Sequence, residues 1–271
     1  MLWLTSVFFS VERPEGPEIP VVVEVPHAGT WVDPETLATL VAPARALGHD
    51  ADLYADELFA DAPRQGACLL RAHVSRYVCD LNRAADDLDA QTTRRGTARA
   101  APHGVIWRRT TEGRPALAAP LEDAEVERRL SFIYRPYHRV LTQLINEKRE
   151  KFGFCVLLCG HTMPTFGRLG ERRADIVPGS RGATSAHAEV LAVPERLAAR
   201  YSLRLEHDTP YRGGYSTGAY GRPEERMHAL QIEIARHLYM DEGTLARKEP
   251  GFSTLRAFCR DLVTELGQLV L

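Results

Sequence analysis

The stretch Ile19-Pro20-Val21-Val22-Val23-Glu24-Val25, followed at once by Pro26-His27-Ala28-Gly29, is the best guide to the fold. Its β-branched residues predict a buried strand that stops at Pro26 and feeds a functional loop. A second apolar run, Phe154-Cys155-Val156-Leu157-Leu158-Cys159, predicts a central buried strand and leads into Gly160-His161. Each predicted strand therefore delivers a histidine to its carboxyl end.

The rest of the chain alternates between helical and strand-like patterns. Apolar residues at helical spacing predict helices, and short β-branched runs predict strands. We expect helices at 34–47, 52–60, 121–151 with a kink at Pro136, 185–201 and 253–270, strands at 67–74, 76–81, 203–205 and 228–234, and long loops at 84–119, 163–184 and 208–225. This alternation predicts an α/β sheet covered on both faces, where ligands gather beyond the carboxyl ends of the strands.

Length and composition narrow the class of protein. A chain of 271 residues with 44% hydrophobic and 26% charged residues is long enough for one large domain, which we expect to span residues 1–271. The net charge of −2 does not provide the basic field that nucleic acids or anionic membranes require. Five cysteines without Cys-x-x-Cys spacing, and the lack of a long apolar run, predict a cytoplasmic protein with no membrane partner.

The two strand-end histidines suggest a metal site. Catalytic zinc sites use three protein ligands and keep one position open. We predict that zinc is bound by His27, His161 and a carboxylate, for which Asp52 is the first candidate, with Asp50 and Asp56 behind it. The alternatives are histidines packed at turns and a solvated acidic helix edge, because two of these aspartates are spaced i, i+4.

Glu233 is the second carboxylate of interest. It lies in the apolar run Leu230-Gln231-Ile232-Glu233-Ile234, where a buried carboxylate is costly unless it has a partner or a role. One interpretation is an ion pair with Arg236 or another arginine. We favour a general base that takes a proton from water and returns it to the leaving nitrogen.

Basic and amide side chains cluster in the run Ser75-Arg76-Tyr77-Val78-Cys79-Asp80-Leu81-Asn82-Arg83. Asn82 and Arg83 suit a substrate carboxylate, since the guanidinium group forms paired hydrogen bonds with it. Arg76 suits the oxyanion that develops during amide hydrolysis. The alternative for both arginines is a surface salt bridge, which is common in a chain with 34 basic residues.

Cys159 offers a rival chemistry, because it lies close to His161 and could act as a nucleophile. Its place inside an apolar run favours a buried, inert thiol instead.

Five groups of residues along most of the chain carry a family resemblance. They are Pro26 to Gly29, Asp52 to Phe59, Ser75 to Arg83, Gly160 to Pro164, and the stretch from Thr209 through Glu233 to Glu242. In these residues the chain resembles the N-formylglutamate amidohydrolase family, which is similar in fold to the zinc carboxypeptidases and aspartoacylase. The carboxypeptidase motif has a glutamate where this chain has Thr30, so the carboxylate ligand has to come from elsewhere. Thr217-Gly218-Ala219-Tyr220 likewise replaces the Thr-Arg-His-Tyr that is typical of the formylglutamate enzymes.

The resemblance implies a three-layer αβα sandwich with a mixed, mostly parallel central sheet. It also implies one zinc ion, a glutamate base and a small N-acyl amino acid as substrate. The first hypothesis is therefore a zinc-dependent amidohydrolase of an N-acyl, possibly N-formyl, amino acid such as N-formylglutamate. The alternatives are a carboxypeptidase-like hydrolase of a peptide or cell-wall fragment, and a non-catalytic carboxylate-binding protein. The sequence does not predict the oligomeric state.

Overall fold

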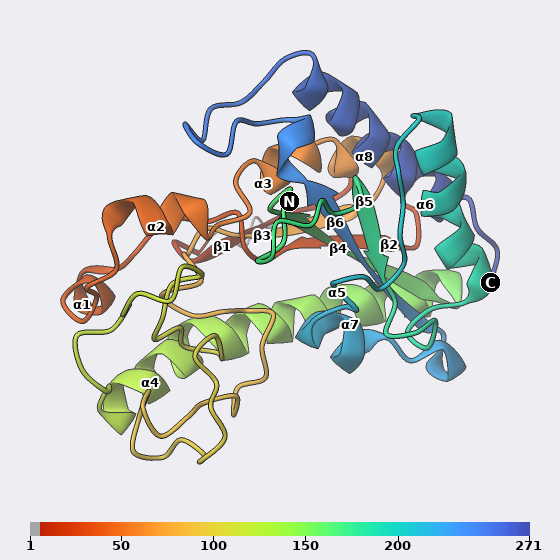
Figure 1. The fold of residues 1–271 in the computed structure, drawn as a ribbon. Helices are drawn as coiled ribbons and strands as arrows, with labels where there is room; N and C mark the ends of the chain where they lie inside the picture. The colour runs from red at the N-terminus through yellow and green to blue at the C-terminus, as the bar shows by residue number, and fades with distance from the viewer. Residues whose placement is uncertain (1–5) are drawn as a thin grey trace.

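The computed structural model describes residues 6–271, and a six-stranded sheet lies at its centre (Figure 1). The strands are β1 (Phe9–Glu12), β2 (Val21–Val25), β3 (Cys68–Ala72), β4 (Cys155–Met163), β5 (Ile176–Gly179) and β6 (Met227–Ala235). Their order across the sheet is β1-β3-β2-β4-β6-β5. Strands β3, β2, β4 and β6 are parallel, and the edge strands β1 and β5 are antiparallel to their neighbours. The predicted mixed, mostly parallel sheet is confirmed.

Helices cover both faces of this sheet. They are α1 (Pro34–Leu37), α2 (Ala44–His49), α3 (Ala55–Leu58), α4 (Asp123–Arg129), α5 (Arg135–Phe152), α6 (Ala188–Arg200), α7 (Tyr215–Tyr220) and α8 (Gly251–Gly267), with 3₁₀ turns at Ala62–Gln65, Pro223–Glu225 and Arg236–Leu238. One core lies between the sheet and α3, α6 and α8, and a second lies between the sheet and α4 and α5. The result is the three-layer αβα arrangement expected from the sequence.

Strand β2 shows why the central runs are mostly apolar. Val21, Val23 and Val25 pack in the core with α8, whereas Val22 packs in the core with α5. Successive side chains of a strand point to opposite faces, so a strand covered on both sides has no face exposed to water, and the one charged residue of β2, Glu24, is buried as well.

The helix predicted at 121–151 is a continuous helical segment with one irregular turn. A π-helical turn at Leu130–Tyr134 joins α4 to α5, and Pro136 stands in the first turn of α5. Proline has no backbone N–H to donate to the preceding turn, and such irregular turns are a recognised way to accommodate it. Within residues 6–271, no helix is both long and apolar enough to cross a membrane.

Three predicted elements before residue 84 are wrong in their extent or type. Residues 76–81 form turns and not a strand, since their apolar side chains are buried in a loop beside the sheet. The helix predicted at 34–47 is divided into α1 and α2, with Pro43 directly before α2. The helix predicted at 52–60 is only α3, because Tyr54 has a φ of 68° and a left-handed backbone cannot continue a helix.

The sequence patterns missed the two edge strands and one short helix. β5 and α7 lie inside segments predicted as loops, and β1 lies in a segment for which no element was predicted. The strand predicted at 203–205 is reduced to a single bridge between Leu205 and Ile176. The long segment 84–119 contains no helix or strand, as predicted.

Candidate active site

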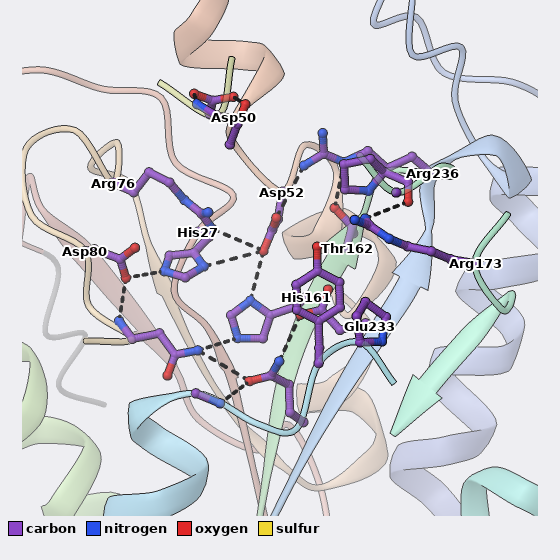
Figure 2. Close-up of a pocket in the computed structure, with 18 of the residues that line it drawn as sticks. His27, Asp50, Asp52, Arg76, Asp80, His161, Thr162, Arg173, Glu233 and Arg236 are labelled. Atoms are coloured by element: carbon purple, nitrogen blue, oxygen red, sulfur yellow. Dashed lines mark hydrogen bonds and ion pairs between the residues drawn. The ribbon is translucent and has the colours of Figure 1, made fainter. Parts of the chain in front are cut away.

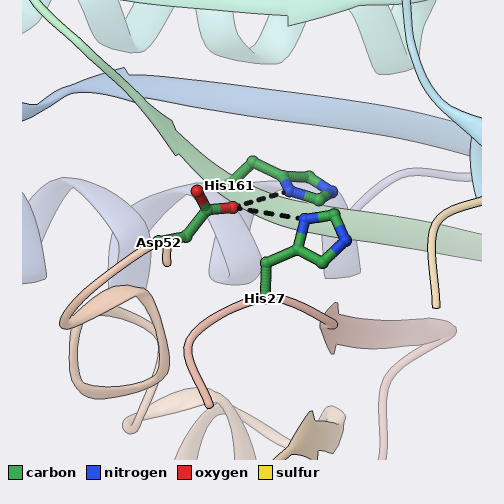
Figure 3. Close-up of side chains that lie close together, drawn as sticks. All are labelled: His27, Asp52 and His161. Atoms are coloured by element: carbon green, nitrogen blue, oxygen red, sulfur yellow. Dashed lines mark hydrogen bonds and ion pairs between the residues drawn. The ribbon is translucent and has the colours of Figure 1, made fainter. Parts of the chain in front are cut away.

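Three side chains meet at the carboxyl ends of the parallel strands (Figure 3). His27 lies two residues after the end of β2, His161 lies near the end of β4, and Asp52 lies in the segment between α2 and α3. The backbone N–H of Asp52 donates to the carbonyl of His27 at 2.9 Å, which ties this segment to the loop after β2. All three side chains are buried.

The geometry of this group is compact. One carboxylate oxygen of Asp52, Oδ2, lies 2.9 Å from Nδ1 of His161 and 3.6 Å from Nδ1 of His27. The three facing atoms all lie within 4.8 Å of one another. Burial opposes ionisation of Asp52, but the charge of Arg76, the hydrogen bond with His161 and the proximity of His27 hold its pKa well below the usual range. The carboxylate is therefore ionised.

Asp50 and Asp56, the other aspartates considered as ligands, lie outside this group. The Asp50 carboxylate accepts hydrogen bonds from the hydroxyl of Tyr77 and from the backbone N–H of Thr111. Asp56 is half-buried on α3. Of the three candidates, the structure brings only Asp52 to the histidines.

Each histidine is held through its outer nitrogen. Asp80 Oδ1 accepts from Nε2 of His27 at 2.7 Å, and Asp80 also accepts from the indole of Trp107 at 2.9 Å and from the backbone of Asn82 at 2.9 Å. Asn82 Nδ2 lies 3.1 Å from Nε2 of His161. Burial opposes ionisation of Asp80, but His27 holds its pKa far below the ordinary value. Such outer partners fix the ring orientation of histidine ligands and, when anionic, raise their basicity.

The donor set fits a metal ion. With its Nε2 proton directed at Asp80, His27 presents the lone pair of Nδ1, and this buried nitrogen has no hydrogen-bond partner among the described residues. A buried polar atom without a partner is rare, and a coordinated cation would satisfy it. Two imidazole nitrogens and one carboxylate oxygen are donors typical of a catalytic zinc site.

Glu233 lies beside the histidine group. In the parallel pairing of β4 with β6 it is in register with His161, so both side chains point to the same face of the sheet. Its carboxylate accepts a hydrogen bond from Gln231 Nε2 at 2.8 Å. Burial and the nearby charge of Asp52 raise the pKa of Glu233 well above its ordinary value.

The ion pair considered for Glu233 does not form in the described part of the chain. Arg236 instead donates to the backbone carbonyls of His49 and Ala51, at 2.7 and 2.6 Å, and lies 3.5 Å from Asp52. It therefore holds the segment that carries the Asp52 carboxylate.

Arg76, Asn82 and Arg83 all line the same cavity as the histidines. The Arg76 side chain is only 13% exposed, lies 3.6 Å from Asp52 and stacks on Trp107 at 4.8 Å. The amide oxygen of Asn82 accepts from the backbone of Ser216 at 2.9 Å, so this side chain is held in one orientation. Arg83 is exposed at the rim.

The cavity has a volume of about 500 Å³ and opens over the histidine group (Figure 2). Besides the residues already placed, Thr162 and Tyr211 line it, together with other residues of the predicted loop segments 84–119, 163–184 and 208–225. It is large enough for an amino-acid derivative and is rich in charged groups.

Two glycines allow this close arrangement. A Cβ on Gly29 would lie 2.2 Å from the backbone of His73, so only glycine lets the His27 loop pack against the end of β3. A Cβ on Gly160 would lie 2.4 Å from the ring of Phe59, so the glycine before His161 makes room for an aromatic side chain.

Cys159 does not reach the cavity. It is fully buried and its thiol donates to Glu24 Oε2 at 3.3 Å. Burial and the carboxyl of Glu24 raise the pKa of the thiol well above its ordinary value, which disfavours the reactive thiolate.

Sequence reasoning missed three residues that support the site: Asp80, Gln231 and Arg236. A usable signal existed for Gln231, because it stands two residues before Glu233 in a strand and so shares its face. Asp80 and Arg236 act through contacts with residues far away in the sequence, and no local pattern indicates such partners.

Comparisons with known proteins agree with one another. The model of the N-formylglutamate amidohydrolase family matches residues 19–240. The chain is 32% identical over 260 residues to an N-formylglutamate deformylase of Pseudomonas aeruginosa, covering 92% of each chain, and 31% identical over 232 residues to one of Pseudomonas putida, covering 83% of each. The crystal structure of an N-formylglutamate amidohydrolase from Ralstonia eutropha is similar with a TM-score of 0.89 and 32% identity, covering 97% of this chain and 98% of that chain.

Proposed function

Because this chain belongs to the N-formylglutamate amidohydrolase family, we propose that it hydrolyses the formyl amide of N-formylglutamate to formate and glutamate. As a member of that family it is a hydrolase of a linear, non-peptide amide bond. The observation that best supports the substrate and the mechanism is the buried group of His27, Asp52 and His161 beside Glu233 in one cavity.

We propose that the group binds zinc. His27 and His161 would each contribute Nδ1, and Asp52 would contribute a carboxylate oxygen. Three protein ligands would leave one coordination position of the ion open, as in catalytic zinc sites. When bound, zinc supplies a Lewis acid and lowers the pKa of water. Asp80 accepts from Nε2 of His27 and would keep that imidazole ring oriented before and after binding.

Glu233 would serve as the general base and then the general acid. Its carboxylate would take a proton from the attacking water and deliver it to the nitrogen that leaves as the amine of glutamate. Burial keeps the pKa of Glu233 high, which favours proton uptake. Gln231 fixes the carboxylate by a hydrogen bond at 2.8 Å.

Arg76 would stabilise the oxyanion of the tetrahedral intermediate. Its guanidinium is largely buried and held against Trp107, so it would need little rearrangement when the charge develops. Arg83, with Asn82 behind it, would bind the α-carboxylate of the substrate, because a guanidinium forms paired hydrogen bonds with that group.

The test is release of the free amine by purified protein, with and without added zinc, from N-formylglutamate, N-acetylglutamate and a dipeptide, with formate measured as the second product from N-formylglutamate. We expect zinc-dependent turnover that is fastest on N-formylglutamate. Faster release of amine from the dipeptide than from the two N-acylglutamates would favour the carboxypeptidase-like alternative. Carboxylate binding without zinc uptake or turnover would favour the non-catalytic protein.

A further inference from the structure

The cavity has more arginines than its own carboxylates can pair. Arg76 and Arg236 lie within ion-pair distance of Asp52. The other arginines of the lining form no ion pair with a carboxylate anywhere in residues 6–271; these are Arg83, Arg168, Arg173 and Arg212. Unpaired positive charge in a concave site favours an anionic ligand, and more than one such arginine favours a ligand with more than one negative charge.

Arg173 differs from the other three in how firmly it is held. Arg83, Arg168 and Arg212 are exposed, whereas Arg173 is half-buried. Nη1 of Arg173 donates to the carbonyl of Pro164 at 3.0 Å, and its guanidinium lies over the ring of Tyr211 at 5.2 Å.

These contacts orient Arg173 and leave donors free. Its Nε is buried and has no hydrogen-bond partner among the described residues, and Nη2 donates to none of them. A pre-oriented guanidinium loses little rotamer entropy when it binds a carboxylate. Arg173 is therefore built to receive an anion, whereas the exposed arginines first have to become ordered.

The position of Arg173 separates it from Arg76, the arginine assigned to the oxyanion. Figure 2 shows Arg173 on the side of Glu233 and Arg236, across the histidine group from Arg76 and Asp80. Tyr211 lies close to Glu233, whose charge adds to burial in raising the pKa of the Tyr211 hydroxyl. The guanidinium of Arg173 thus offers a second cationic group, on the Glu233 side of the cavity, to a substrate that is bound at the reaction centre.

We propose that Arg173, positioned by Tyr211 and Pro164, binds the side-chain carboxylate of the substrate and makes the enzyme selective for N-formyl amino acids with acidic side chains. This inference rests on the proposed function. A neutral side chain would leave the guanidinium donors unmatched in a partly buried site, and such mismatches give strong discrimination.

The kinetic test compares N-formylglutamate with N-formylglutamine, which has the same shape without the side-chain charge. Arg173→Gln should lower kcat/KM for N-formylglutamate roughly 10- to 100-fold, the usual effect of losing a hydrogen bond to a charged group, and change N-formylglutamine by less than about threefold. Arg173→Lys keeps the charge but loses the paired N–H donors of the guanidinium. It should show a smaller loss, which again affects N-formylglutamate more than N-formylglutamine. Arg83→Gln should instead impair both substrates, because both have the α-carboxylate.

Arg172→Gln is the matched control, since Arg172 is an exposed neighbour on the same loop and does not line the cavity. It should leave both substrates unchanged. An equal loss on both substrates for Arg173→Gln and Arg173→Lys would overturn the proposal. A selective loss for Arg168→Gln or Arg212→Gln with none for Arg173→Gln would overturn it as well.

A binding experiment separates this proposal from the proposed function. Calorimetry with glutarate, which has two carboxylates, and glutaramate, which has one, requires no turnover. The wild-type protein should prefer glutarate, and Arg173→Gln should abolish that preference. If the protein deformylates no N-formyl amino acid, the proposed function fails while glutarate preference still decides the role of Arg173.

Discussion

The carboxyl edge of the sheet and the interior directly beneath it each contain a buried glutamate, and the two have different surroundings. Glu233 lines the cavity and lies near Asp52 and the histidines. Glu24 is sealed inside β2, where Ser216 Oγ donates to it at 3.1 Å and Cys159 Sγ at 3.3 Å. Burial raises the pKa of both glutamates, to about 7 for Glu24. A raised pKa is thus no mark of catalysis, and access to the cavity distinguishes the two.

The largest effects should come from the histidines at the edge. His27→Ala and His161→Ala each remove one of three proposed ligands, so zinc content and activity should both fall to background. The fold should persist, because neither side chain belongs to a hydrophobic core. Metal analysis and circular dichroism check this. A histidine variant with full zinc occupancy would remove that residue from the site.

Glu233→Gln should have the next largest effect. The amide keeps the shape of the side chain but cannot accept the proton, so kcat should fall on the order of 10² to 10⁴-fold. Zinc content and substrate affinity should remain. Turnover close to wild type would place the base elsewhere, and loss of zinc would make Glu233 a ligand.

Glu24→Gln should affect stability and not turnover. The pKa of Glu24 is raised from 4.5 when unfolded to about 7 when folded, so its contribution to stability is complete below pH 4.5 and is lost as the pH rises through 7. Relative to Glu24→Gln, the wild type should lose on the order of 3 kcal/mol over this window.

Urea unfolding of both proteins at pH 4.5 and pH 8 measures this difference. The variant should be similar to the wild type at low pH and more stable at high pH. A constant difference across the window would show that Glu24 does not change its ionisation there.

Cys159→Ala should have the smallest effect on activity. The thiol is buried with Glu24 and outside the cavity lining, so kcat should stay within about twofold of wild type, as for substitutions away from the reacting groups. Removal of the buried sulfur should cost about 1 kcal/mol of unfolding free energy. Loss of activity with zinc retained would revive the thiol nucleophile.

The central strands and their histidines were predictable because buried parallel strands have a continuous apolar sequence. The same rule failed at 76–81, where Tyr77 and Leu81 are equally apolar but are buried in turns beside the sheet. A buried strand and a buried turn have the same apolar composition. Only the elements that pack against the segment decide whether it forms a strand or a turn. The edge strands β1 and β5 were missed because four residues give too short a pattern.

The ligand group was predictable in part. Positions after strands indicated the two histidines, and Asp52 was one of three nearby aspartates with the same local signal. The choice among them depends on Tyr54, whose left-handed backbone ends the predicted helix and leaves Asp52 in a loop tied to His27. The bond between Asp80 and His27 joins residues 53 positions apart, so no local pattern could reveal it.

The most direct test of the account is zinc stoichiometry in Asp52→Asn, with Asp50→Asn as the matched control. Both aspartates are buried and only two residues apart, but only Asp52 faces the histidines. We predict one zinc per chain in the wild type and in Asp50→Asn, and loss of zinc in Asp52→Asn, each measured on folded protein. Full zinc occupancy in Asp52→Asn, or its loss in Asp50→Asn alone, would contradict the proposed site.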